Sequence, residues 1–366
     1  MSESTHDQNE IIQFERMAHG PNAVGRLASG KVVMAPGVAP GDRVKIKILK
    51  EHKGYIEAEI AEVVERSADY REPACQHARS GECGGCGWQH LDESAQQREK
   101  ERQIKREINR VAPEAELRPI RTDVPPFGYR RRAKLGHKPG MLGYRKRGVR
   151  EIFDVQTCPV LVPKLEAALG EIRASVNDWK SGNVDVMVDR KGRVVVGGPA
   201  RSFLQPSAMT EKVLVEMVLD AIPPTAHRIE ELFAGSGTFT IPLLERGHHV
   251  RAFEGDKQTV ALLQERAKGV VAIRADLLRP GVELSLGQPD VVLLDPPRKG
   301  AAPCMPAIIR SQAPMIVYVS CEATTLCRDI ETLRKGGYQV DWVQPIDAFP
   351  QTEHVETVAV LRWKGN

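Results

Sequence analysis

The chain has 366 residues, of which 41% are hydrophobic and 27% charged, and its formal net charge is +4. A chain of this length and composition is globular and provides for about two or three domains, each with its own core. The small net charge excludes a uniformly basic chain. A surface for nucleic acid therefore has to come from local clustering of Lys and Arg.

The N-terminal segment and the cysteine count predict the cellular compartment. MSESTHDQNE has neither the basic start nor the apolar stretch of a secretory signal, and no apolar run approaches the length of a membrane span. Seven cysteines is an odd number, which favours reduced thiols that serve as metal ligands or nucleophile over a disulfide framework. We therefore expect a cytoplasmic protein with no membrane association.

The first half of the chain predicts a barrel, a helix and a sheet. Residues 11–65 alternate apolar and polar positions between glycines, which is typical of a small antiparallel barrel that either binds nucleic acid or is purely structural. Residues 91–111 are rich in helix formers with charges of both signs, and predict a solvated helix. Residues 126–200 contain short β-like runs separated by turns, which fits an antiparallel sheet.

Three cysteines, Cys75, Cys83 and Cys86, lie in CQHARSGECGGC, where glycines allow the backbone to wrap closely around a ligand. A tetrathiolate site needs a fourth thiol. Cys158 in QTCPVL is the best candidate, because the other three cysteines fall in the second half of the chain. The spacing contains one Cys-x-x-Cys pair rather than two, which favours a [4Fe-4S] cluster over structural zinc, the alternative.

A basic cluster overlaps the predicted sheet. Residues 125–150 hold nine Lys and Arg and no acid. Arg130, Arg131 and Arg132 in this run are candidates to hold RNA phosphates while nearby aromatic rings stack on bases. The alternative is a solvated basic face.

In the second half, Pro223-Pro224 marks a linker, after which strand and helix patterns alternate through RIEELF, HVRAFE, VVAIRAD, DVVLLD and MIVYVS. This alternation predicts an α/β fold with a doubly wound parallel sheet. In such a sheet, ligands bind beyond the carboxyl ends of the strands.

The first of these strands runs into a turn that contains Gly235 and Gly237. Thr240 occupies the position where a dinucleotide fingerprint has its third glycine, which argues against NAD or FAD. Glu254 ends the second strand, where a carboxylate can accept both ribose hydroxyls, and Asp276 follows the third, placed to accept from an adenine amine. The arrangement suits S-adenosylmethionine; alternatively, both acids are helix caps.

Cys321 directly follows the apolar strand VYVS, so its thiol is expected at a strand end. A thiolate that adds to carbon 6 of a pyrimidine makes carbon 5 nucleophilic, and a base must later remove the carbon 5 proton. FPQTEHVETVAVL offers Glu353 and Glu356 as this base, and Glu356 is the more rigidly placed because it begins a β-like run. Asp295 in LLDPPRKG is a candidate to hydrogen-bond a uracil edge, although DPP turns also occur in amino-methylating enzymes. The pattern favours methyl transfer through a covalent cysteine adduct.

Taken in order, these motifs resemble the RNA uracil-5 methyltransferase family, specifically the branch that acts on 23S rRNA, over nearly the whole chain. The resemblance implies an N-terminal OB-like TRAM β-barrel (9–65), a small central α+β domain that contacts RNA and carries an iron-sulfur site (66–200), and a Rossmann-like methyltransferase domain that uses S-adenosylmethionine (201–366). It further implies that the helix over residues 91–118 packs with the catalytic domain.

Carried over by motif, the resemblance makes Cys321 the nucleophile, Glu356 the base and Asp295 the uracil-contacting acid. The residues implied to contact S-adenosylmethionine share positions at the glycine turn, the strand ends and the Phe203-Leu204-Gln205 motif: Gln205, Phe233, Ala234, Gly235, Gly237, Glu254, Asp276 and Asp295. The implied cluster ligands are Cys75, Cys83, Cys86 and Cys158. Glu353 replaces a small residue of the family's base motif and so remains a rival base.

The sequence therefore predicts a monomeric enzyme that makes 5-methyluridine in 23S rRNA. One alternative is the same reaction on tRNA. Another is an RNA-binding protein whose methylase half is inactive, against which the intact set of Cys321, Glu356 and Asp295 argues.

Overall fold

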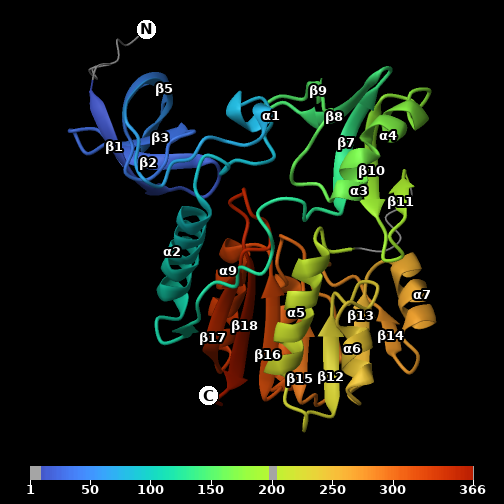
Figure 1. Ribbon diagram of the computed structural model, residues 1–366. Helices are drawn as coiled ribbons and strands as arrows, with labels where there is room; N and C mark the ends of the chain where they lie inside the picture. Colours follow the sequence, from blue (N-terminus) through green and yellow to red (C-terminus); the bar gives the residue numbers. More distant parts are fainter. Residues whose placement is uncertain (1–9, 198–203, 366) are drawn as a thin grey trace.

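The computed structural model describes residues 10–197 and 204–365. The described residues form a closed five-stranded barrel, a five-stranded sheet and an eight-stranded sheet (Figure 1). They follow in this order along the chain except that one short strand of the eight-stranded sheet precedes the five-stranded sheet. The domain limits predicted at residues 9, 200 and 201 lie outside the described residues, as does Phe203 of the glutamine motif.

The N-terminal barrel is built from strands with the alternation that the sequence predicts. Ile12 and Phe14 point inward and are fully buried, whereas their neighbours are exposed. On the outside, Lys and Arg of one long strand pair with Glu of the next, as in Lys45–Glu62 and Lys47–Glu59. The barrel prediction is confirmed; its strands, in the order β1-β2-β3-β5-β4, are β1 (Ile11–Met17), β2 (Asn22–Arg26), β3 (Val32–Pro36), β4 (Arg43–Glu51) and β5 (Tyr55–Glu65).

The short helix α1 (Gln76–Arg79) and the long helix α2 (Glu93–Val111) follow the barrel. Asp92 caps α2 by accepting a hydrogen bond from the Ala95 amide at 2.7 Å. The predicted helix is confirmed, but the expectation of a solvated helix is wrong. Ala95 packs into the barrel core, and Ile104 and Ile108 pack into the core of the eight-stranded part. The apolar residues that this helix contacts are distant in sequence, so its own pattern of charges did not show which face is buried.

The central part is an antiparallel sheet, as the sequence predicts, with two short helices against it. Leu135, Leu142 and Leu165 are fully buried in its core. The strand order is β11-β10-β7-β8-β9, and the elements are β7 (Arg132–Lys138), β8 (Met141–Arg145), β9 (Ile152–Asp154), α3 (Pro163–Ala167), α4 (Leu169–Ser175), β10 (Gly182–Val188) and β11 (Val194–Val196).

The C-terminal part is an eight-stranded sheet between two helical layers (Figure 1). Its strand order is β14-β13-β12-β15-β16-β18-β17-β6, with β6 (Glu116–Leu117), β12 (Arg228–Leu232), β13 (His249–Glu254), β14 (Val271–Arg274), β15 (Val291–Leu294), β16 (Met315–Ser320), β17 (Tyr338–Ile346) and β18 (Glu356–Trp363). One face packs against α5 (Ala208–Ala221), α6 (Thr240–Glu245) and α7 (Lys257–Arg266). The other packs against α2, α8 (Met305–Ser311, preceded by a 3-10 turn at Ala302–Cys304) and α9 (Ala323–Lys335).

The sheet departs from the predicted all-parallel arrangement at one edge. Strands β12 to β16 are parallel, but β18 runs antiparallel to both β16 and β17. The start of β18 therefore lies beside the end of β16. Within the described residues, no helix is both long and apolar enough to cross a membrane.

Candidate active site

The antiparallel pairing of β16 and β18 brings the predicted nucleophile and base together. Ser320 pairs with Thr357, so Cys321 and Glu356 occupy the next position of the same register. Cys321 is half-buried between β16 and α9, and Glu356 is only 5% exposed. A thiol and a carboxyl that are 35 residues apart in sequence thus face the same end of the sheet.

Asp295 adds a second carboxyl to this end of the sheet. It directly follows β15, the strand beside β16, and its amide approaches the Leu232 carbonyl of β12 at 3.4 Å. Asp295 therefore lies between the glycine turn after β12 and the thiol after β16. Its role at the edge of a uracil stays a prediction.

The electrostatics of the three groups are dominated by burial. Burial, followed by the charges of Glu356 and Asp295, raises the pKa of Cys321 to about 12. Burial and the charge of Asp295 raise the pKa of Glu356 to about 8, and burial raises the pKa of Asp295 to about 7. The thiol is thus neutral at neutral pH before a substrate binds, whereas both carboxyls titrate near neutrality.

Arg298, three residues after Asp295, supplies the opposing positive charge. Its guanidinium lowers the pKa of both Cys321 and Glu356. It also lies 3.2 Å from Nε2 of His354, and because a guanidinium only donates, this ring nitrogen is the acceptor. The sequence reasoning assigned no role to Arg298, although its position directly after the two prolines of the DPP turn was a usable signal.

The raised pKa of Glu356 gives a prediction about stability. The folded protein retains a proton that the unfolded chain releases near pH 4.5, so the wild-type fold loses stability as the pH rises from about 4.5 to about 8. Glutamine cannot ionise. We expect Glu356→Gln to be more stable than the wild type by an amount on the order of 5 kcal/mol at about pH 9, with the difference shrinking toward pH 5. Urea unfolding at several pH values measures this difference, and a gap that does not change with pH would contradict the assignment.

Glu353, the rival base, lies differently. Its Oε2 lies close to Gly87, since a Cβ built on Gly87 would stand 3.4 Å from it. Its charge acts on Lys100 and His354, whereas the largest charge effects on the Cys321 pKa come from Glu356 and Asp295. This geometry favours Glu356 as the base.

The turn after β12 has the backbone of a ligand-binding loop. Phe233 adopts φ +63°, unusual for a residue with a side chain, and is followed by Gly235 at φ +55° and Gly237 at φ +95°. A Cβ on Gly237 would lie 2.9 Å from a methyl of Leu263. Position 237 therefore requires glycine. Ala234, in the same turn, is buried.

Glu254 is the last residue of β13, and Asp276 lies two residues after the end of β14. Glu254 accepts hydrogen bonds from the amides of Gly235 at 3.0 Å and Asp256 at 2.9 Å, whereas Asp256 caps α7. Glu254 is therefore tied to the glycine turn and is not the cap of the helix that follows it. Asp276 is exposed and accepts from the Leu278 amide at 3.2 Å within a turn.

A buried acid at this turn was not among the candidates from the sequence. Glu231 on β12 is 1% exposed, and its Oε2 accepts from the Thr240 hydroxyl at 2.6 Å. Its Oε1 and the hydroxyl of Ser236 are buried without a partner among the described residues. Burial raises the pKa of Glu231 to about 8. The sequence signal for Glu231 was an acid at the second-last position of a predicted strand.

The three consecutive arginines of the basic run have different surroundings. Arg131 is 8% exposed, pairs with Glu211, and donates through Nε to the Gln205 carbonyl at 2.9 Å. It therefore holds the segment that carries the buried Gln205. Arg130 and Arg132 are half-buried; Arg130 donates to the Arg132 carbonyl, and Arg132 pairs with Asp185. Of the three, Arg131 is thus the one enclosed by protein.

The four predicted cluster ligands line one small hollow between α1 and the central sheet: Cys75, Cys83, Cys86 and Cys158. None forms a disulfide. The Gly85 amide donates to Sγ of Cys83 at 3.3 Å, and the hydroxyl of Tyr144 lies 3.6 Å from Sγ of Cys158. Burial, then the neighbouring thiols, raises the pKa of Cys86 to about 12. In the part of the chain that the structure describes, no three ligating side chains have the spacing of a single-ion site.

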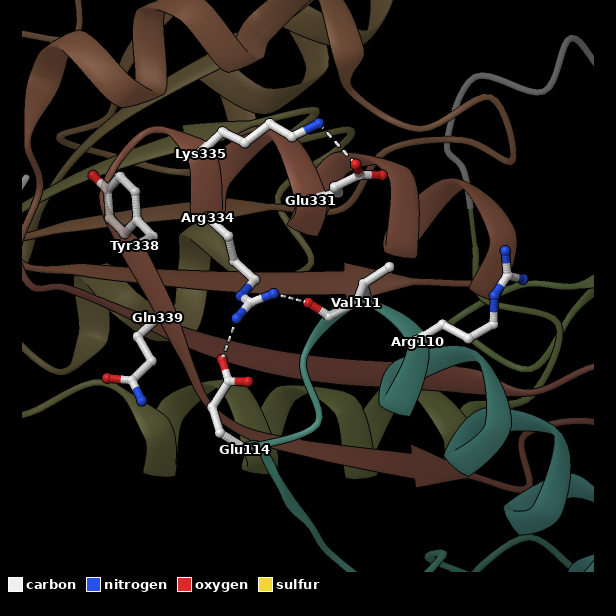
Figure 2. Close-up of a pocket in the computed structure, with 8 residues that line it drawn as sticks. All are labelled: Arg110, Val111, Glu114, Glu331, Arg334, Lys335, Tyr338 and Gln339. Carbon is white, nitrogen blue, oxygen red and sulfur yellow. Dashed lines mark hydrogen bonds and ion pairs between the residues drawn. The ribbon is translucent and has the colours of Figure 1, made fainter.

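A hollow of about 690 Å³ lies far from these residues, between the end of α2 and the end of α9 (Figure 2). Arg334 there contacts both Glu114 and the Val111 carbonyl, and Lys335 pairs with Glu331. The Arg334 contacts join α9 to the end of α2 and the segment after it, whereas the Lys335–Glu331 pair lies within α9. Arg110 pairs with Glu107 outside the hollow, so the charges that line the hollow all have partners and we assign no ligand to it.

Comparisons with known proteins identify the family of this chain. A family model described as tRNA (Uracil-5-)-methyltransferase matches residues 268–364, a range that includes Cys321, Asp295 and Glu356 but not Glu254. A TRAM domain model matches residues 10–61. A protein of Marinomonas sp. named 23S rRNA (uracil(1939)-C(5))-methyltransferase RlmD is 30% identical over 423 residues, which cover 97% of this chain and 95% of that protein. The chain belongs to the RNA (uracil-5-)-methyltransferase family. This confirms the family, the enzyme class and the N-terminal TRAM barrel that the sequence predicts.

Two further proteins are similar to this RNA methyltransferase over most of its length. The protein of the same name from Marinomonas posidonica is 29% identical over 416 residues, 95% of this chain and 94% of that protein. The crystal structure of Pyrococcus abyssi tRNA (uracil-54, C5)-methyltransferase in complex with S-adenosyl-L-homocysteine superimposes with a TM-score of 0.76 at 20% identity, and covers 96% of this chain and 100% of that one. At this identity the likeness shows the fold.

Proposed function

We propose that this protein methylates carbon 5 of a uracil in 23S rRNA, with S-adenosylmethionine as the methyl donor. The observation that carries the proposal is the juxtaposition of Cys321 and Glu356 at the paired ends of β16 and β18, with Asp295 on the adjoining strand. The ribosomal substrate follows the names of the two Marinomonas relatives.

In the proposed reaction the Cys321 thiol releases its proton and the sulfur adds to carbon 6 of the uracil, which turns the ring into an enolate and makes carbon 5 nucleophilic. Asp295 hydrogen-bonds the uracil edge and holds the ring over the thiol. After carbon 5 has been methylated, Glu356 removes its proton, and the sulfur leaves carbon 6 by elimination. A base with a pKa near the working pH suits this step, and that of Glu356 is about 8.

The residues around the β12 turn fit the proposed methyl donor. S-adenosylmethionine supplies an electrophilic methyl group when it is bound. The left-handed turn at Phe233 to Gly237 allows close approach to the backbone, and the Glu254 carboxylate is already oriented by the Gly235 amide. Ser236, whose hydroxyl has no partner among the described residues, lies in this turn, and Glu231, whose Oε1 likewise has none, lies on β12 just before it. Gln205 and Asp276 complete the proposed contacts.

We further propose that Cys75, Cys83, Cys86 and Cys158 hold a [4Fe-4S] cluster. Two observations support it: the four thiols surround one hollow, and the Gly85 amide donates a hydrogen bond to the Cys83 sulfur. The single Cys-x-x-Cys pair, where a structural zinc site commonly has two, favours a cluster over zinc.

Replacing Cys86 by serine tests the cluster. We expect anaerobically purified wild type to contain about four irons and four inorganic sulfides per chain, and Cys86→Ser to lose most of both. Elemental analysis and sulfide assay measure this. Cys304→Ser, at a buried thiol of the C-terminal part, is the matched control and should keep the full complement. One zinc per wild-type chain without sulfide would contradict the cluster.

The proposed substrate is tested by incubating the protein with radiolabelled S-adenosylmethionine and either 23S rRNA or tRNA, each prepared by transcription in vitro. We expect label in 23S rRNA, and 5-methyluridine as the labelled nucleoside. Label in tRNA alone would keep the reaction but change the substrate. No label in either RNA would support the inactive RNA-binding alternative.

A further inference from the structure

The loop between β17 and β18 connects the edge of the sheet to the proposed base. Residues 347–354, which we call the base loop, end two residues before Glu356. Asp347, Gln351 and Thr352 in the loop are buried. Gln351 adopts φ +73°, so the loop holds a conformation that a residue with a side chain rarely adopts unless its surroundings impose it.

The first support of the base loop is a lysine of α2. Lys100 is fully buried, and its ammonium donates to Oδ1 of Asp347 at 2.5 Å and to the Phe349 carbonyl at 3.1 Å. A buried ammonium is tolerated because it is paired and hydrogen-bonded. This contact joins parts of the chain 247 residues apart.

The second support lies one helical turn earlier. The side-chain oxygen of Gln96 accepts from the Gln351 amide at 2.8 Å, and its nitrogen donates to the Gln351 side-chain oxygen at 3.1 Å. The same nitrogen lies 2.9 Å from the Leu91 carbonyl, which fixes the orientation of the Gln96 amide. Gln96 thus recognises both the backbone and the side chain of the residue with positive φ.

Other segments complete the enclosure of the base loop. The Trp88 amide donates to the Gln351 carbonyl at 3.0 Å, and the Tyr129 hydroxyl donates to the Pro350 carbonyl at 2.9 Å. Cys321, in contrast, is carried by β16 and α9. The contacts of Gln96 and Lys100 therefore bear on the position of Glu356 rather than on that of the nucleophile.

We propose that Gln96 and Lys100 are positioning residues for the proton-abstraction step: they fix the base loop and thereby the carboxyl of Glu356. The inference rests on the proposed function, because it requires Glu356 to be the base. It predicts that loosening the loop leaves formation of the RNA–Cys321 adduct largely intact and slows its resolution.

The test uses Gln96→Met, which keeps the length and helix propensity of the side chain and removes its hydrogen bonds. A misplacement of about 1 Å costs on the order of 100-fold in rate, so we expect kcat to fall 10- to 100-fold while kcat/KM for S-adenosylmethionine, which reports the steps up to methyl transfer, changes less than about twofold. The fraction of enzyme that migrates with RNA on a denaturing gel during turnover should rise. Gln351→Gly, which removes the partner side chain and suits the positive φ, should give the same result and serves if Gln96→Met does not fold.

Gln97→Met, the same substitution at the next residue of α2, is the matched control and should behave like the wild type. Wild-type kcat in a folded Gln96→Met protein would overturn the inference, as would an adduct fraction that falls with kcat. Glu356→Gln is assayed in the same experiment as Gln96→Met. If the wild type methylates RNA but Glu356→Gln accumulates no adduct, the proposed role of the base fails first and the positioning role fails with it.

Discussion

Cys321→Ala is expected to lose methyl transfer by more than about 10³-fold, because no other group described here can add to carbon 6. The thiol is neutral at neutral pH, so its removal exposes no buried charge. Folding and RNA binding should therefore be retained. Methylation rate, thermal unfolding and a filter-binding assay on the same preparation separate these effects.

Cys327→Ala is the matched control for this variant. Cys327 lies on α9 within the apolar core, six residues from the nucleophile, and should keep wild-type turnover apart from a modest loss of stability. Persistent turnover of Cys321→Ala would remove the covalent mechanism from the account.

Glu356→Gln should lose multiple turnover by roughly 10²- to 10⁴-fold, the usual contribution of a general base, and accumulate the methylated RNA–enzyme adduct. Glutamine matches glutamate in size but cannot accept the carbon 5 proton, so the sulfur cannot leave. A denaturing gel shows the adduct as protein that migrates with RNA, and mass spectrometry of the digest locates it on Cys321.

Glu353→Gln separates the two candidate bases. This substitution replaces a carboxyl of the same segment by the same uncharged amide. The Glu353→Gln enzyme should turn over without accumulating adduct. Accumulation in Glu353→Gln and normal turnover in Glu356→Gln would assign the base to the other residue.

Local patterns were sufficient to predict the elements that carry the site. Cys321 and Asp295 each directly follow an apolar strand pattern and Glu254 ends one, and the structure brings the ends of those strands to one edge of the sheet. The direction of β18 was not predictable in this way, because an apolar run looks the same in parallel and antiparallel sheets. That direction places Glu356 beside Cys321.

The supports of the site were not predictable, because their partners are far away in sequence. Lys100 and Gln96 belong to a helix whose mixed charges indicate solvent, yet both are buried against the base loop. Arg131 belongs to a run that predicts a basic surface, yet it is paired with Glu211, 80 residues away. Periodicity and composition report local preferences and carry no information about such pairs.

The central claim is that this methyltransferase acts at carbon 5 of uracil, and RNA labelled with tritium at that carbon tests it most directly. Methylation at carbon 5 expels the hydrogen that carbon 5 carried. We predict one tritium released into water for each methyl group transferred. Methyl transfer with all tritium retained in the RNA would place the new methyl group on another atom and contradict the account.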